Sequence, residues 1–135
     1  MKTLTTLLLL MLILASPAIG EDDPTTKFLK GIGKLLKAEN SGALSGYFPA
    51  TGKVELRLKG VNPGHFRKGQ AKSLLATYFK QIEALDYKLK SVNGLVGKFE
   101  MNYRLVADGR KVKGTTHVYL QKEGESWLIV GIVES

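Results

Sequence analysis

The 135-residue sequence contains no cysteine and only two histidines, His65 and His117. Without thiols the chain can form no disulfide, no thiolate metal site and no cysteine nucleophile. No motif ties the two histidines to carboxylates, so we expect no metal site. A nucleophilic-serine motif and a glycine-rich phosphate loop following a strand are also missing. We therefore expect no bound cofactor and find no motif of catalytic residues.

Long hydrophobic runs are absent after the first twenty residues. Lys2 precedes an apolar stretch at 7–15, and small residues end at Gly20, just before an acidic segment. This order is typical of a cleaved secretory signal, and the run is too short for a membrane anchor, which needs about 20 apolar residues. We expect a signal peptide at 1–20 and one domain at 21–135, secreted and periplasmic or extracellular.

Positive charge is abundant but never concentrated. The net charge is +8, and removal of Lys2 with the signal leaves 8 − 1 = +7. Such a balance favours contact with anionic surfaces such as lipid headgroups or polysaccharides, with solubility as the simpler explanation. No run of five or more basic residues occurs, so we expect no specific nucleic-acid partner.

Two segments have the periodicity of amphipathic helices, at 25–38 and 68–83, and 43–48 adds a short helical turn. In the first, apolar residues and lysines occupy opposite arcs (Phe28, Ile32, Leu35 and Leu36; Lys27, Lys30, Lys34 and Lys37). A lysine stripe of this kind also suits a peptide lying on an anionic membrane. We favour docking within the domain, with Gly42 as the left-handed cap that follows the helix.

Strand patterns dominate the rest of the chain. Val54, Leu56 and Leu58 alternate with charged residues, and residues 65–66 form a short extended return. Four longer strands follow at 86–92, 97–106, 111–121 and 126–133, and each junction ends in a glycine suited to a tight turn, at Gly94, Gly109 and Gly124. This predicts an α+β fold in which an antiparallel meander is covered on its apolar face by the helices and leaves a cone-shaped cleft.

The order of elements and several short motifs resemble a known superfold. The motifs lie at 43–48, 54–56, 65–71, 118–119 and 124–132. Together they resemble the nuclear transport factor 2-like superfold, also called cystatin-like, and within it an uncharacterised family of small secreted Bacteroidota proteins. The resemblance implies helices packed in the concave face of a curved antiparallel sheet and assigns no biochemical role. Arg67 stands where such relatives often have a serine, which implies a weaker cap for the second helix.

Aromatic residues and one histidine supply the candidate ligand-binding side chains. They would line a cleft for a small hydrophobic ligand, with core packing as the alternative role, above all for Tyr78 and Trp127. His117, with Tyr103 or Glu100 nearby, is the group to test for acid–base chemistry, although its strand pattern puts it on the less buried face. The candidate residues are Tyr47, Tyr78, Tyr103, His117, Tyr119 and Trp127.

Three functions remain open from the sequence. The leading one is a non-catalytic binding or interaction module that holds a ligand or partner in the cleft or on the sheet face, with a homodimer among the expected partners. The alternatives are a small isomerase or hydrolase acting on a hydrophobic molecule, and electrostatic attachment to anionic envelope polymers or membrane.

Overall fold

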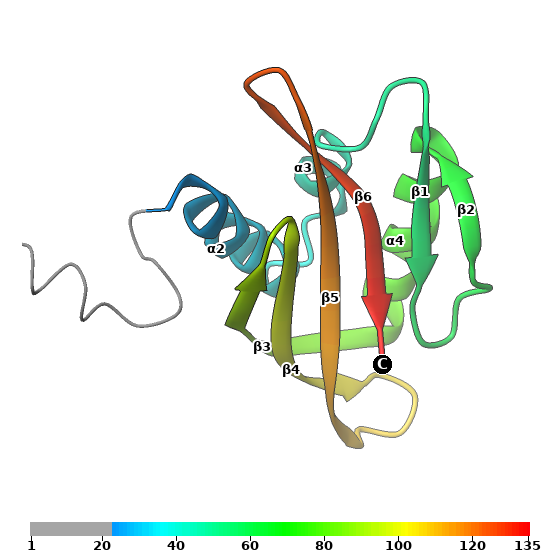
Figure 1. Ribbon diagram of the computed structural model, residues 1–135. Coiled ribbons are helices and arrows are strands. Elements are labelled where there is room, and N and C mark those ends of the chain that lie inside the picture. Colours follow the sequence, from blue (N-terminus) through cyan, green and yellow to red (C-terminus); the bar gives the residue numbers. More distant parts are fainter. Residues whose placement is uncertain (1–22) are drawn as a thin grey trace, which may run out of the picture.

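Three helices and six strands occupy residues 23–135, the part of the chain that the computed structural model describes (Figure 1). The signal peptide predicted at 1–20 lies outside these residues. The helices are α2 (Pro24–Lys37), α3 (Ser41–Ser45) and α4 (Lys68–Gln81). The strands are β1 (Lys53–Arg57), β2 (Gly64–Arg67), β3 (Ile82–Asn93), β4 (Val96–Leu105), β5 (Lys111–Glu123) and β6 (Ser126–Glu134).

All six strands form one sheet in the order β2-β1-β6-β5-β4-β3. The predicted meander is present, because β3, β4, β5 and β6 pair antiparallel in sequence order. The sheet is nevertheless mixed, since β1 runs parallel to β6, with Leu56 opposite Ile132. A parallel neighbour requires a long connection, and here β2, α4 and the first three strands of the meander lie between β1 and β6 in the sequence.

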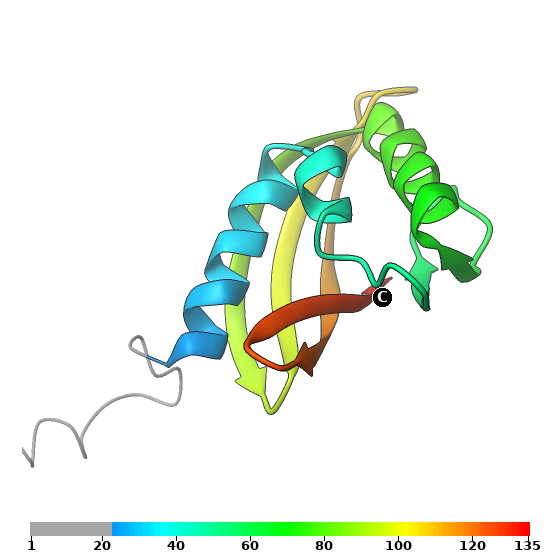
Figure 2. The same cartoon turned by 90° about the horizontal axis from the view of Figure 1, so that it is seen from above.

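The α+β prediction is confirmed: the sheet is curved and unclosed, and the helices lie along its concave side (Figure 2). Two glycines allow the first helix to approach the sheet. A Cβ on Gly97 of β4 would lie 2.8 Å from Leu29, and one on Gly33 of α2 would lie 2.8 Å from the Phe99 ring. Leu29 and Phe99 are fully buried, so the apolar side of α2 docks within the domain, as expected.

The end of α2 differs from the prediction of a cap at Gly42. Glu39 takes the left-handed conformation, with φ 56°, and Gly42 lies inside α3. A left-handed residue with a side chain costs roughly 1 to 2 kcal/mol. The Glu39 carboxylate offsets part of that cost, because its Oε2 accepts a 2.7 Å hydrogen bond from the backbone N–H of Ala84 in β3.

The junction between α4 and β3 was also predicted wrongly, as a helix to 83 and a strand from 86. The helix ends at Gln81 and the strand begins at once, with Ile82 extended and opposite Leu105. Ile82 fits the apolar face of either element, so periodicity could not decide between them. The helix start agrees with expectation, because Arg67 makes no side-chain cap hydrogen bond.

Candidate functional site

The six candidate residues do not form one site but fall into three pairs in different parts of the fold. Tyr78 and Tyr103 are buried on the concave side of the sheet, at 1% and 0% exposure. Tyr47 and Trp127 lie near the β5–β6 hairpin and both contact Phe28 of α2. The third pair, His117 and Tyr119, belongs to the opposite face of the sheet.

The buried pair is joined by a residue that sequence reasoning missed, Glu134 at the end of β6. The Tyr103 hydroxyl donates to Oε2 of Glu134 at 2.6 Å, and the Tyr78 hydroxyl donates to Oε1 at 3.0 Å. The backbone N–H of Lys59, after β1, also donates to Oε1, at 3.1 Å. Three segments that are distant in sequence thus meet on one half-buried carboxylate.

The phenols around this carboxylate remain protonated over a wide pH range. Burial raises the pKa of Tyr78 and of Tyr103 well above the ordinary tyrosine value, and the hydrogen bond to Glu134 raises the pKa of Tyr103 further. Burial also raises the pKa of the neighbouring Tyr87 to about 12, although its hydrogen bond with Tyr78 offsets part of the rise. Each phenol can therefore act as a hydrogen-bond donor at neutral pH.

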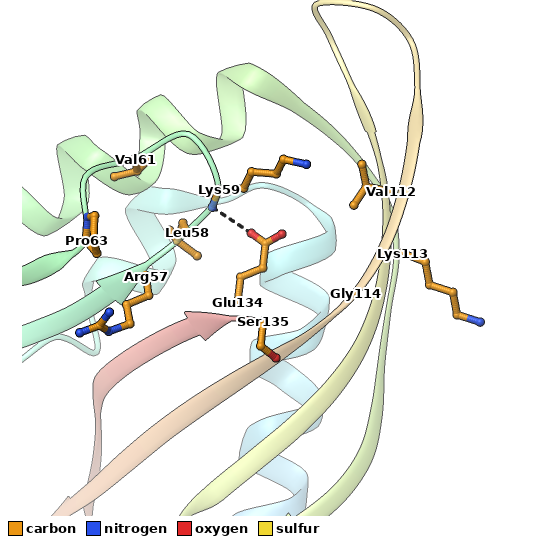
Figure 3. A pocket seen from close by; sticks show the side chains of 10 residues that line it. All are labelled: Arg57, Leu58, Lys59, Val61, Pro63, Val112, Lys113, Gly114, Glu134 and Ser135. Carbon is orange, nitrogen blue, oxygen red and sulfur yellow. Dashed lines mark hydrogen bonds between the residues drawn. The ribbon is translucent and has the colours of Figure 1, made fainter.

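A cleft reaches this cluster because β6 ends before β5 does at this end of the sheet. Glu134 pairs with Thr116, so residues 111–114 of β5 have β4 on one side and no β6 partner on the other. Beyond Arg57 the chain leaves the sheet. A cleft of about 520 Å³ opens between these segments. Figure 3 shows its lining: Arg57, Leu58, Lys59, Val61, Pro63, Val112, Lys113, Gly114, Glu134 and Ser135.

The cleft lining combines apolar side chains with the Glu134 carboxylate and three basic residues, Arg57, Lys59 and Lys113. Leu58 and Val61 come from one side and Val112 from the other. In Figure 3 the carboxylate of Glu134 points toward the backbone of Lys59, and the side chain of Lys113 points away from the cleft. An ionised carboxylate has about four acceptor positions, and three are used here. One position on Oε2 remains for a ligand that donates a hydrogen bond.

Glu134 could have been found from the strand pattern alone. It stands two residues after Ile132, so an alternating strand turns both side chains to the same face. Ile132 is buried and Glu134 lies beside it on the concave side. A carboxylate on the apolar face of a strand is the signal, but the predicted strand ends at residue 133, one residue before Glu134.

The second pair belongs to an aromatic cluster. The ring of Phe28 lies edge-on to Tyr47, with centroids 5.0 Å apart, and stacks on Trp127 at 5.5 Å. The Lys122 ammonium lies 4.2 Å from the centre of the Trp127 ring. The Trp127 ring already has two partners within the domain, which makes it a packing residue at the end of α2. A hollow of about 530 Å³ lies beside this cluster.

The pair proposed for acid–base chemistry, His117 with Tyr103, is separated by the sheet. Tyr103 is opposite Val112 and His117 is opposite Lys98, so the two residues have opposite parity on paired strands. Tyr103 points into the core, while His117 lies on the outer face, with its ring centre 6.4 Å from that of Tyr119. Glu100 shares the outer face, but within residues 23–135 it forms no hydrogen bond with His117.

Residues 23–135 contain no group of three or more histidine, cysteine, aspartate or glutamate side chains that could hold a metal ion. None of the helices in this range is long and apolar enough to cross a membrane.

Comparison with solved structures supports the fold. A DUF4783 family protein from Bacteroides uniformis has a TM-score of 0.61 at 17% identity, covering 78% of this chain and 94% of that one. An uncharacterised cystatin fold protein from Novosphingobium aromaticivorans has a TM-score of 0.59 at 13% identity, covering 82% and 97%. A designed NTF2-like protein has a TM-score of 0.60 at 20% identity, covering 86% and 100%.

These likenesses confirm the expected fold: this chain has the nuclear transport factor 2-like, or cystatin-like, architecture, and its structural neighbours include uncharacterised Bacteroides proteins. Identities of this size establish fold alone. No protein-family model and no curated protein matches the sequence.

Proposed function

We propose that this protein is a non-catalytic binding module that holds a small, largely apolar molecule in the cleft beside Glu134. The observation that carries the proposal is the Glu134 carboxylate, which is held by Tyr78, Tyr103 and the backbone of Lys59 and lines a cleft of about 520 Å³. Ligand sites of this size are usually apolar with a few fixed polar groups that orient the ligand. Here the fixed group is an acceptor, so the ligand carries a hydroxyl or amino donor.

The rigidity of the acceptor favours binding over turnover. Tyr78 and Tyr103 are buried and bonded to separate oxygens of Glu134, so the carboxylate is oriented before any ligand arrives. Both histidines lie away from the cleft: His65 is exposed on β2 and His117 is on the outer face of β5. Neither histidine is therefore placed to exchange a proton with Glu134 through a bound ligand.

Native mass spectrometry of the protein purified from its own export compartment tests the proposal. We expect a bound small molecule that is retained by the Glu100→Gln variant and lost from Glu134→Gln. The two variants remove the same charge, but Glu100 lies on the outer face of β4. Equal ligand occupancy in both variants would contradict the proposal, and thermal unfolding of each would establish that the fold is intact.

A second candidate is an isomerase- or hydrolase-type enzyme acting on a hydrophobic molecule. The observation that favours it is the same carboxylate, because an acceptor flanked by two protonated phenols can take a proton while the phenols stabilise developing negative charge. Incubating the released ligand with fresh protein distinguishes the two candidates. Chemical conversion that Glu134→Gln abolishes would favour the enzyme, and recovery of unchanged ligand would favour the binding module.

We also propose that the protein is exported after cleavage of its signal peptide, that it can form a homodimer, and that its positive charge attaches it to anionic surfaces. Cell fractionation with intact-mass measurement tests cleavage after Gly20, and sedimentation tests for a homodimer. Co-sedimentation with anionic polymers across a salt series tests whether the net charge of +7 attaches the protein to them. Binding that does not change with salt would exclude an electrostatic origin.

A further inference from the structure

Of the three basic residues that line the cleft beside Glu134, one is available to a ligand. Arg57 donates from Nε to Oε2 of Glu55 at 2.8 Å, so its guanidinium already has a carboxylate partner. The side chain of Lys113 points away from the cleft (Figure 3). Lys59 lines the cleft, and its ammonium forms no ion pair or hydrogen bond within residues 23–135. The charge of Lys59 can therefore meet a bound molecule.

A tight turn places Lys59 beside the carboxylate. The N–H of Val61 donates to the carbonyl of Leu58 at 3.1 Å, and Gly60 has a positive φ of 79°, which suits glycine at the third position of such a turn. The same turn directs the backbone N–H of Lys59 at Oε1 of Glu134, at 3.1 Å. The lysine side chain therefore starts next to the carboxylate, and in Figure 3 it extends toward the β5 side of the cleft.

The Glu134 carboxylate is fixed by neutral donors only. Its Oε1 accepts from the Tyr78 hydroxyl and the Lys59 backbone, and its Oε2 accepts from the Tyr103 hydroxyl. Within residues 23–135 no cation forms an ion pair with this carboxylate. A ligand amine at the remaining position of Oε2 would form a charge-assisted hydrogen bond, which is roughly twice as strong as one between neutral groups. The site therefore favours an ammonium over a hydroxyl as the ligand donor.

A ligand with a single charge fits this pair of groups less well than a zwitterion. A carboxylic acid without an amine would meet Lys59 but would bring a second negative charge toward Glu134 and offer it no donor. An amine without a carboxylate would meet Glu134 and leave Lys59 unmatched. An α-amino acid carries its ammonium and its carboxylate on one carbon. That spacing suits two charged side chains from residues that are themselves in hydrogen-bond contact.

We propose that the cleft binds a free α-amino acid with a large apolar side chain. The ligand ammonium donates to Oε2 of Glu134, and the ligand carboxylate meets the ammonium of Lys59. The apolar side chain lies against Val61 and Val112, which line the cleft and are half-buried. A volume of about 520 Å³ is within the usual range for small-molecule sites. This inference rests on the proposed function and names the class of its ligand.

Titration calorimetry of the exported chain with L-phenylalanine and two truncated analogues tests the inference. Phenethylamine lacks the carboxylate, and 3-phenylpropanoate lacks the amine. We expect one bound L-phenylalanine per chain and the weakest binding from 3-phenylpropanoate. Phenethylamine should bind about fivefold more weakly than L-phenylalanine, which is the upper end for an exposed charge pair.

Variants assign each ligand charge to its residue. Lys59→Gln keeps the backbone N–H that holds Glu134, and it should weaken L-phenylalanine binding about fivefold without weakening phenethylamine binding. Lys113→Gln is the matched control. It removes the same charge from a residue that lines the cleft but points away from it, and it should change neither affinity. Glu134→Gln should weaken the binding of both amines by about tenfold.

The possible failures separate this inference from the proposed function. Phenethylamine binding that needs Glu134 but gains nothing from the added carboxylate would overturn the inference and leave the proposed function intact. Equal loss of L-phenylalanine affinity in Lys59→Gln and Lys113→Gln would show that net charge alone acts, which also overturns it. Amine binding unchanged in Glu134→Gln would contradict both. If neither L-phenylalanine nor L-leucine binds, the amino-acid class is refuted, and native mass spectrometry still decides the proposed function.

Discussion

Alkaline pH should destabilise this protein through three buried tyrosines, Tyr78, Tyr87 and Tyr103. Their exposed fractions are 1%, 9% and 0%, and burial raises the pKa of each, to about 12 for Tyr87. A tyrosine whose pKa is raised by folding keeps its proton in the folded state after the unfolded chain has released it. Its contribution to stability is therefore complete below the unfolded pKa of about 10 and is lost as the pH rises toward the folded pKa.

The size of the effect follows from proton linkage. Each raised tyrosine removes up to about 1.4 kcal/mol of unfolding free energy per pH unit within this window. For three tyrosines the loss between neutral pH and one unit above the unfolded pKa is about 4 kcal/mol. That is a large share of the roughly 5 to 15 kcal/mol that stabilises an ordinary domain. Urea unfolding followed by the fluorescence of Trp127 at a series of alkaline pH values measures it.

Variants at single tyrosines separate this cause from general alkaline effects. Tyr87→Phe removes one of the three phenols and should reduce the alkaline loss by about a third. Tyr47→Phe, at an exposed tyrosine outside the cluster, is the matched control and should leave the loss at its wild-type size. An unfolding free energy that stays level through the alkaline range, or an undiminished loss in Tyr87→Phe, would refute the reasoning.

Two further predictions concern packing and capping. Gly97→Ala should lower the unfolding free energy by about 1 to 3 kcal/mol, because its Cβ would lie 2.8 Å from Leu29, whereas Gly31→Ala, with no atom within 4 Å, should raise it by up to about 1 kcal/mol. Urea unfolding of both variants checks this, and a stable Gly97→Ala would contradict the close approach of α2. Glu39→Ala should cost about 1 to 3 kcal/mol by leaving the Ala84 N–H without its acceptor, while Glu39→Gln, which keeps an acceptor oxygen, should cost less. Equal thermal unfolding midpoints for the two Glu39 variants would count against this hydrogen bond.

Local sequence patterns predicted most of the secondary structure, because periodicity and turn chemistry act between near neighbours. The glycines expected in the turns, Gly94, Gly109 and Gly124, all have positive φ. Alternation along β5 also placed His117 on the less buried face, where it lies. One error occurred at Ile82, where the helix and strand patterns overlap. Another occurred at Glu39, whose left-handed conformation is stabilised by a hydrogen bond from the distant Ala84 N–H of β3 to its carboxylate.

The candidate site was predicted only in part. Tyr78 and Tyr103 were named as ligand-binding residues and do lie together, 6.4 Å apart between ring centres. Their shared partner Glu134 was overlooked, and His117 was grouped with Tyr103 although the two residues lie on opposite faces of the sheet. The sequence of one strand does not show which residues of other strands will lie beside its own.

Composition and periodicity by themselves determine that this chain builds amphipathic helices and a meander of strands without disulfides, because these properties depend on residue type and near spacing. Sheet order decides the rest. Only the insertion of β6 between β1 and β5 brings Glu134 to Tyr78 and Tyr103 and leaves the cleft open beyond the end of β6. Pairing between strands far apart in sequence depends on the packing of the whole core. A short stretch of sequence does not contain that information.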